Sequence, residues 1–159
     1  VQIIAKDRMR YTKDKFSSML AILAIVFDCL YFVSIYQSDV GTFYYNWLIG
    51  VSIVYNLIFL LAAFLASESV KNRRTGYSGI LIVLGVVQIA RIFILPAQAH
   101  AATVLVNGVE TVVMGDKQYL YCVACLVISA ICCIVAAVVS AKNNKTLADY
   151  MKTLENKAA

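Results

Sequence analysis

The chain has little charge, proline or glycine. Charged residues make up 14% of its 159 residues, whereas a soluble globular domain has about 25%. One proline and seven glycines leave little room for disordered linkers. Hydrophobic residues make up 62% of the chain, and the mean hydropathy is +0.79. A soluble core of this size cannot bury so many apolar residues, so the composition indicates an integral membrane protein.

Four apolar runs are long enough, or nearly so, to cross a bilayer. A spanning helix needs about 20 mostly apolar residues, and a helix satisfies its own backbone hydrogen bonds in lipid. The runs cover residues 16–36, 46–67, 77–95 and 119–141. The first run follows a basic segment, as in a signal peptide, but it is too long for one and no small-residue cleavage site follows it. We therefore expect an all-α integral membrane protein, built as one domain with a four-transmembrane-helix bundle.

Lys and Arg lie almost entirely on one side of the expected helices. Five precede the first helix, three lie in the loop 68–76, and four follow the last helix. The loop 37–45 has none, and the loop 96–118 has only Lys117. Cytoplasmic loops are rich in Lys and Arg. The count of twelve such residues on one side of the spans against one on the other therefore predicts that both termini are cytoplasmic (N-in/C-in), in the plasma membrane. The net charge of +5 does not indicate nucleic acid as a partner, since the basic residues stand between apolar runs that face the lipid bilayer.

The loop 96–118 contains a hairpin signal. Asn107-Gly108 stands between two runs rich in β-branched residues. This dipeptide favours a type I′ turn, in which both central residues have positive φ. We predict a small extracytoplasmic β-hairpin over about 103–114, with an irregular loop as the alternative.

The tail after the last span has the pattern of an amphipathic helix. Apolar residues recur at helical spacing from Leu147 to Leu154, and Thr146 with Asp149 resembles the start of a capping box. We expect a separate cytoplasmic tail helix over about 146–157. It would lie on lipid headgroups or bind a partner, and a short solvated helix is equally compatible with the pattern.

Two charged residues, Asp28 and Arg91, lie inside the expected spans. Such residues are costly in lipid, so they usually face the bundle and pair. At 1.5 Å per residue, Asp28 lies about 18 Å along the first helix and Arg91 about 21 Å along the third. We therefore predict an intramembrane polar network of Asp28 and Arg91 with Gln88 and Asn56. It could be a structural clamp, a transport or ligand site, or an Arg91 that reaches the interface unpaired.

Small or polar residues recur along one face of three of the expected helices. In lipid, small residues let helix backbones approach closely. We expect these stripes to face inward, with the large apolar residues facing lipid or a partner. The stripes are Ser17, Ala21, Ala24 and Asp28; Ser52, Asn56, Ala63 and Ala66; and Cys122, Cys125, Ser129, Cys133, Ala136 and Ser140.

All five cysteines fall inside expected spans, which does not fit the disulfide framework of secreted proteins. Cys122-Val-Ala-Cys125 has the spacing of a redox pair. Over those four residues and the helix count, the chain resembles the vitamin K epoxide reductase and DsbB class of membrane thiol oxidoreductases. The resemblance implies thiol–disulfide chemistry at Cys122 and Cys125, served by a shuttle cysteine pair in an outer loop that this chain lacks. The other interpretation is that small cysteines simply pack in a tight helix interface.

The sequence has few of the groups that catalysis needs. It contains no nucleotide-binding loop, no HExxH and no nucleophile elbow, and its single histidine, His100, has no partners at metal-ligand spacing. We therefore expect a non-enzymatic protein without cofactor or metal, most simply an interaction or accessory subunit of a membrane complex or a homo-oligomer. The alternatives are a small transporter or channel at the Asp28/Arg91 level and a thiol oxidoreductase at Cys122/Cys125.

Overall fold

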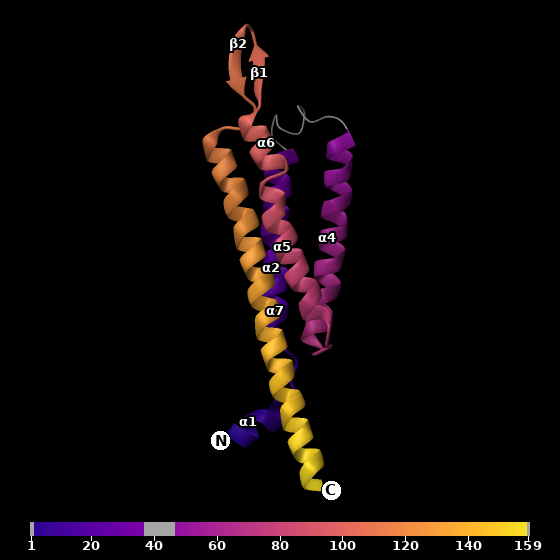
Figure 1. The fold of residues 1–159 in the computed structure, drawn as a ribbon. Helices are drawn as coiled ribbons and strands as arrows, with labels where there is room; N and C mark the ends of the chain where they lie inside the picture. The colour runs from indigo at the N-terminus through magenta and orange to yellow at the C-terminus, as the bar shows by residue number, and fades with distance from the viewer. Residues whose placement is uncertain (1, 37–46, 159) are drawn as a thin grey trace.

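A computed structural model of the chain describes residues 2–36 and 47–158. The described residues are mostly helical, and four helices are long and apolar enough to cross a membrane (Figure 1). These helices are α2 (Lys15–Tyr36), α4 (Trp47–Lys71), α5 (Tyr77–Ile92) with its continuation α6 (Leu95–Ala101), and α7 (Asp116–Ala158). The prediction of four apolar helices long enough to span a membrane is therefore confirmed.

The first two spans lie close to where hydropathy predicts them. α2 begins at Lys15, one residue early, and α4 continues to Lys71, beyond the predicted end at residue 67. The predicted start of the second span at residue 46 and the loop 37–45 lie outside the described residues. A short helix that the sequence did not predict, α1 (Gln2–Met9), precedes α2 and lies beside the C-terminal part of α7 (Figure 1).

The third span is interrupted, which corrects the prediction of one helix over 77–95. α5 ends at Ile92 and α6 begins at Leu95 with Pro96 in its first turn. Proline has no N–H to donate, and its ring clashes with the carbonyl four residues earlier, which here is that of Ile92. The first turn of a new helix tolerates proline, so the chain restarts there. His100, which we expected in a loop, lies on α6.

The last span and the tail form one continuous helix of 43 residues. The predicted separate start near residue 146 is wrong, because the Thr146 hydroxyl donates a hydrogen bond to the backbone carbonyl of Lys142 at 2.9 Å. This is the bond of a threonine within a helix, not of a cap. At 1.5 Å per residue α7 is about 65 Å long, so it extends well past the ends of α4 and α5 (Figure 1).

A two-stranded antiparallel sheet stands between α6 and α7, as predicted. β1 (Thr103–Val106) pairs with β2 (Val109–Val112) in a register that sets Val106 opposite Val109. Asn107 has φ 53° and Gly108 has φ 82°, the two positive values that a type I′ turn requires. The hairpin lies at the end of the bundle opposite to both termini (Figure 1).

The predicted stripes of small residues form the interior of the bundle. Every stripe residue of α2 and α7 is buried, and in α4 only Ser52 is half-exposed. The helices approach closely at Gly85 of α5, where a Cβ would lie 2.8 Å from Ile134 Cγ1 and 3.2 Å from the Ala130 carbonyl oxygen of α7. Many large apolar side chains are exposed on the outside of the bundle, which suits contact with lipid, whereas Phe59, Leu81 and Leu126 are fully buried inside it.

Candidate functional site: a buried arginine beside an intramembrane cavity

Asp28 of α2 and Arg91 of α5 form an ion pair inside the bundle. Arg91 Nη1 lies 2.7 Å from Asp28 Oδ1, and the two side chains are 8% and 1% exposed. The structure thus brings together the two residues that sequence depth placed at one level. Arg91 is paired and does not reach the interface alone. Two charges held this far from water stabilise each other only while both are present.

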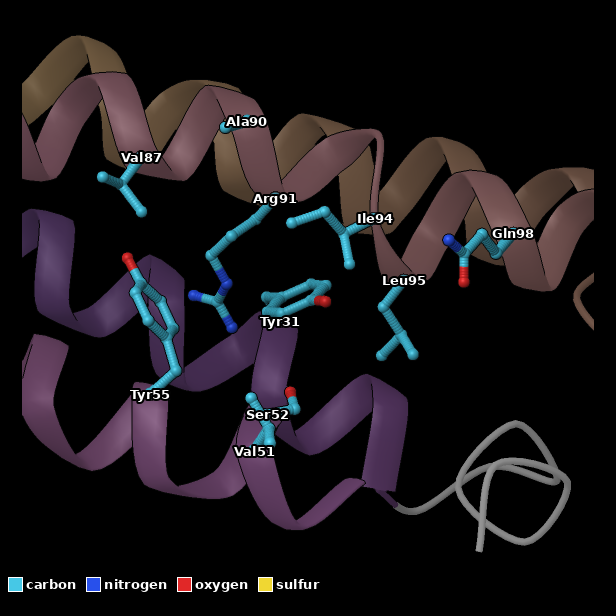
Figure 2. A pocket seen from close by; sticks show the side chains of 10 residues that line it. All are labelled: Tyr31, Val51, Ser52, Tyr55, Val87, Ala90, Arg91, Ile94, Leu95 and Gln98. Carbon is cyan, nitrogen blue, oxygen red and sulfur yellow. The ribbon is translucent and has the colours of Figure 1, made fainter. Parts of the chain in front are cut away.

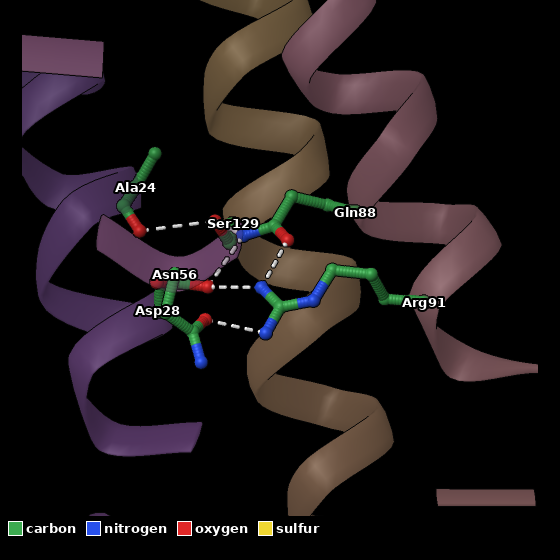
Figure 3. A network of polar contacts seen from close by, with 6 residues as sticks. All are labelled: Ala24, Asp28, Asn56, Gln88, Arg91 and Ser129. Atoms are coloured by element: carbon green, nitrogen blue, oxygen red, sulfur yellow. Dashed lines mark hydrogen bonds and ion pairs between the residues drawn. The ribbon is translucent and has the colours of Figure 1, made fainter. Parts of the chain in front are cut away.

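Arg91 also binds two side-chain amides. Its Nη1 donates to Gln88 Oε1 at 2.8 Å, and its Nη2 donates to Asn56 Oδ1 (Figure 3). Gln88 lies one turn before Arg91 on α5, so its carbonyl reaches the guanidinium directly. The guanidinium therefore joins α2, α4 and α5.

Gln88 extends the network to α7. Its Nε2 donates to Asp28 Oδ1 at 2.9 Å and to Ser129 Oγ at 3.0 Å. Ser129 in turn donates to the backbone carbonyl of Ala24 at 2.9 Å (Figure 3). All four spanning helices are thus connected at one level. Ser129 was predicted to lie in the small-residue stripe of α7, but not in this network.

Two tyrosines that the sequence analysis missed lie against the guanidinium. Arg91 Cζ lies 4.9 Å from the centroid of the Tyr31 ring and 4.7 Å from that of the Tyr55 ring. Both distances are within the range of about 6 Å for cation–π attraction. The sequence signal that could have found these tyrosines is their distance along the chain from the predicted site residues. Tyr31 lies three residues after Asp28 on α2, and Tyr55 immediately precedes Asn56 on α4.

Several polar atoms of this cluster have no protein partner among the described residues. Asp28 Oδ2, Asn56 Nδ2 and the Tyr55 hydroxyl are buried without a hydrogen bond. Arg91 donates three hydrogen bonds, although a guanidinium has five N–H groups. A buried polar group without a partner costs about 1–3 kcal/mol. The cluster therefore has more spare donors than spare acceptors.

A cavity of about 310 Å³ lies beside the cluster, between α4 and the α5–α6 segment (Figure 2). Arg91, Tyr31 and Tyr55 form part of its wall, and the Tyr55 hydroxyl points from α4 toward Val87 of α5. The volume is at the lower end of the range for small-molecule sites, about 300–1,000 Å³. The other lining residues are Val51, Ser52, Val87, Ala90, Ile94, Leu95 and Gln98.

Cys122 and Cys125 do not line the cavity, although they pack in the same apolar cluster as Tyr31. Both thiols are free and buried, in an apolar cluster with Tyr31 and Ile35 of α2. Cys122 Sγ lies 3.7 Å from Ser34 Oγ. The pair thus occupies the close interface of α2 and α7. Within residues 2–36 and 47–158, no group of three His, Cys, Asp or Glu side chains is arranged to hold a metal ion.

Comparison with protein-family models, with curated proteins and with solved structures gives no match.

Proposed function

We propose that this protein is a non-enzymatic multi-pass membrane protein that binds an uncharged amphiphile in the cavity at the Asp28–Arg91 level. The observation behind the proposal is that Arg91 and Tyr55 belong both to the buried polar cluster and to the cavity wall. Each has hydrogen-bonding capacity that the described residues do not use. A structural clamp alone needs neither a cavity beside it nor spare donors that face one.

The charge balance of the site favours an uncharged ligand. Asp28 already compensates the charge of Arg91 at 2.7 Å, so a second anion would leave a net negative charge buried in a medium of low dielectric. An ester or amide carbonyl accepts from the Arg91 N–H groups and the Tyr55 hydroxyl without adding charge. The apolar side chains of Val51, Val87 and Ile94 fit the hydrocarbon part of such a molecule.

We also propose that both termini are cytoplasmic and that the hairpin lies on the opposite side of the membrane. This proposal rests on the positive-inside rule. α1, the turn between α4 and α5, and the C-terminal end of α7 lie toward one end of the bundle, with the hairpin at the other (Figure 1). Twelve of the fourteen Lys and Arg residues fall in the segments at the first of these ends.

Association with other membrane proteins or with a second copy stays a prediction. The outward apolar faces of the spanning helices suit lipid as well as protein, so they do not favour a partner by themselves. A native-detergent mass measurement separates a monomer from a homo-oligomer or a complex.

A photoreactive probe tests the ligand proposal. The probe is a monoacylglycerol with a diazirine in its acyl chain, added to the purified protein in nanodiscs and crosslinked by light. We expect saturable labelling of peptides that contain residues 51–55 and 87–98. Ser52→Phe places a ring in the cavity and should lower this labelling about tenfold, which is 1.4 kcal/mol of binding free energy.

Val54→Phe is the matched control, because Val54 is on the same helix, is 56% exposed and does not line the cavity. It should label like the wild type. Both variants should unfold at the wild-type temperature. Labelling spread evenly over the four spanning segments, or equal in Ser52→Phe and Val54→Phe, contradicts the proposal.

A further inference from the structure

A second recess lies where α2 begins, at the end of the bundle opposite the hairpin. It has a volume of about 610 Å³ and combines basic with aromatic side chains. It is a separate feature from the cavity at Arg91, with which it shares no residue. Its lining residues are Tyr11, Thr12, Lys13, Asp14, Lys15, Phe16 and Arg73.

The one carboxylate of the recess is already satisfied. Asp14 Oδ1 accepts the backbone N–H of Ser17 at 3.2 Å, and Oδ2 accepts the Ser17 hydroxyl at 3.1 Å and Asn143 Nδ2 at 3.2 Å. Asp14 is 4% exposed and acts as the N-cap of α2. Because its oxygens are occupied, it does not neutralise the basic side chains around it by direct pairing.

Arg73 is held in place from the opposite side of the recess. It follows the end of α4 in the left-handed region, with φ 56°, and its backbone N–H donates to the Val70 carbonyl at 2.9 Å. Its Nε donates to the Thr12 carbonyl at 2.9 Å. Its Nη1 is buried without a partner among the described residues. The guanidinium is thus anchored by one nitrogen and has N–H groups to spare.

The recess is electropositive and lies at the edge of the apolar span. Lys13, Lys15 and Arg73 give three positive charges against the single charge of Asp14. Phe16, 60% exposed, is the first apolar residue of α2 and lines the recess. Polar headgroups meet hydrocarbon at such a boundary, and basic clusters there attract anionic lipids.

We propose that this recess binds the phosphate of an anionic phospholipid. A guanidinium matches the oxygens of a phosphate in geometry and charge, so Arg73 is the central contact, with Lys13 and Lys15 as flexible point charges. Phe16 packs against the glycerol and upper acyl region. Binding here ties the start of α2 and the end of α4 to one lipid molecule, independently of any ligand at Arg91.

Native mass spectrometry from mixed micelles of phosphatidic acid and phosphatidylcholine tests the proposal. We expect the wild-type protein to retain one phosphatidic acid in preference to phosphatidylcholine. Lys13→Gln with Arg73→Gln should lower that retention about tenfold. Lys13→Gln with Lys15→Gln also removes two positive charges but leaves the hydrogen bond from Arg73 to Thr12 intact. It should cause a smaller loss of phosphatidic acid retention, and this loss cannot come from breaking that structural contact.

The control is Lys152→Gln with Lys157→Gln, which removes the same charge from an exposed part of α7. It should retain lipid like the wild type. An equal loss in the control, or equal retention of the two lipids by the wild type, overturns the proposal. Inorganic phosphate at millimolar concentration should not displace the lipid. Displacement would assign the recess to free phosphate and overturn the lipid as its occupant.

Discussion

Removal of one member of the Asp28–Arg91 pair should destabilise the bundle more than removal of both. Arg91→Leu leaves the Asp28 carboxylate, 1% exposed, with Gln88 as its one remaining hydrogen-bond donor among the described residues. Asp28→Leu leaves the guanidinium buried with two neutral amide partners. Either change breaks a buried pair by removing one charge, which costs about 3–5 kcal/mol.

The double variant, Asp28→Leu with Arg91→Leu, leaves no buried charge. It deprives the carbonyl oxygens of Gln88 and Asn56 of their donor, at a cost of about 1–3 kcal/mol for each oxygen. The two single variants together sum to about 6–10 kcal/mol. At the middle of these ranges, the double variant should therefore be about 4 kcal/mol more stable than additivity predicts.

The assay is the free energy of unfolding in mixed micelles, titrated with a denaturing detergent. Arg74→Leu is the control, because Arg74 is exposed outside the spans, and it should change stability by less than about 0.5 kcal/mol. If the double variant loses the sum of the two single losses, the residues act independently and the clamp between α2 and α5 does not exist.

Three further predictions concern packing, thiols and the hairpin. Gly85→Ala should lower the free energy of unfolding by about 1–3 kcal/mol, because the added Cβ would lie 2.8 Å from Ile134 Cγ1. Gly79→Ala should not lower it in the same detergent titration, because nothing lies within 4 Å of a Cβ at that position. N-ethylmaleimide should modify Cys122 and Cys125 only after unfolding, because both thiols are buried in the native bundle. A Cys122–Cys125 disulfide in freshly purified protein would instead support the redox interpretation. Gly108→Val forces a β-branched residue to φ 82°, so amide hydrogen exchange should become faster across β1 and β2 while α5 and α7 stay protected. Unchanged exchange in the two strands would contradict the type I′ turn.

Hydropathy predicted the spans because apolar length is what a bilayer selects. Hydropathy does not predict helices that lie outside the hydrocarbon core of the bilayer. α7 continues through Thr146 to Ala158 where the sequence becomes polar, and α1 forms in a basic segment, so neither the continuity of the first nor the presence of the second was predicted. The predicted third span ended at residue 95, just before Pro96, so neither the break after Ile92 nor the helix α6 was predicted.

The level of Asp28 and Arg91 could be predicted because helical rise is uniform. Their neighbours depend on how the helices are rotated and spaced, which residue spacing alone does not fix. Tyr31 and Tyr55 lie against Arg91 and Ser129 completes the network only because α2, α4 and α7 present those faces. The cavity arises from the way α4 meets α5 and α6, a packing property with no sequence signal.

The central claim is that a ligand carbonyl binds at Arg91. The most direct measurement is the side-chain Nε–H resonance of each arginine in nitrogen-15-labelled protein in nanodiscs, titrated with a monoacylglycerol. We predict a saturable shift at Arg91 that Ser52→Phe abolishes, with no shift at Arg8, Arg10 or Arg74. A titration that leaves the Arg91 resonance unmoved, or that moves all the arginines alike, would contradict a binding site in the cavity.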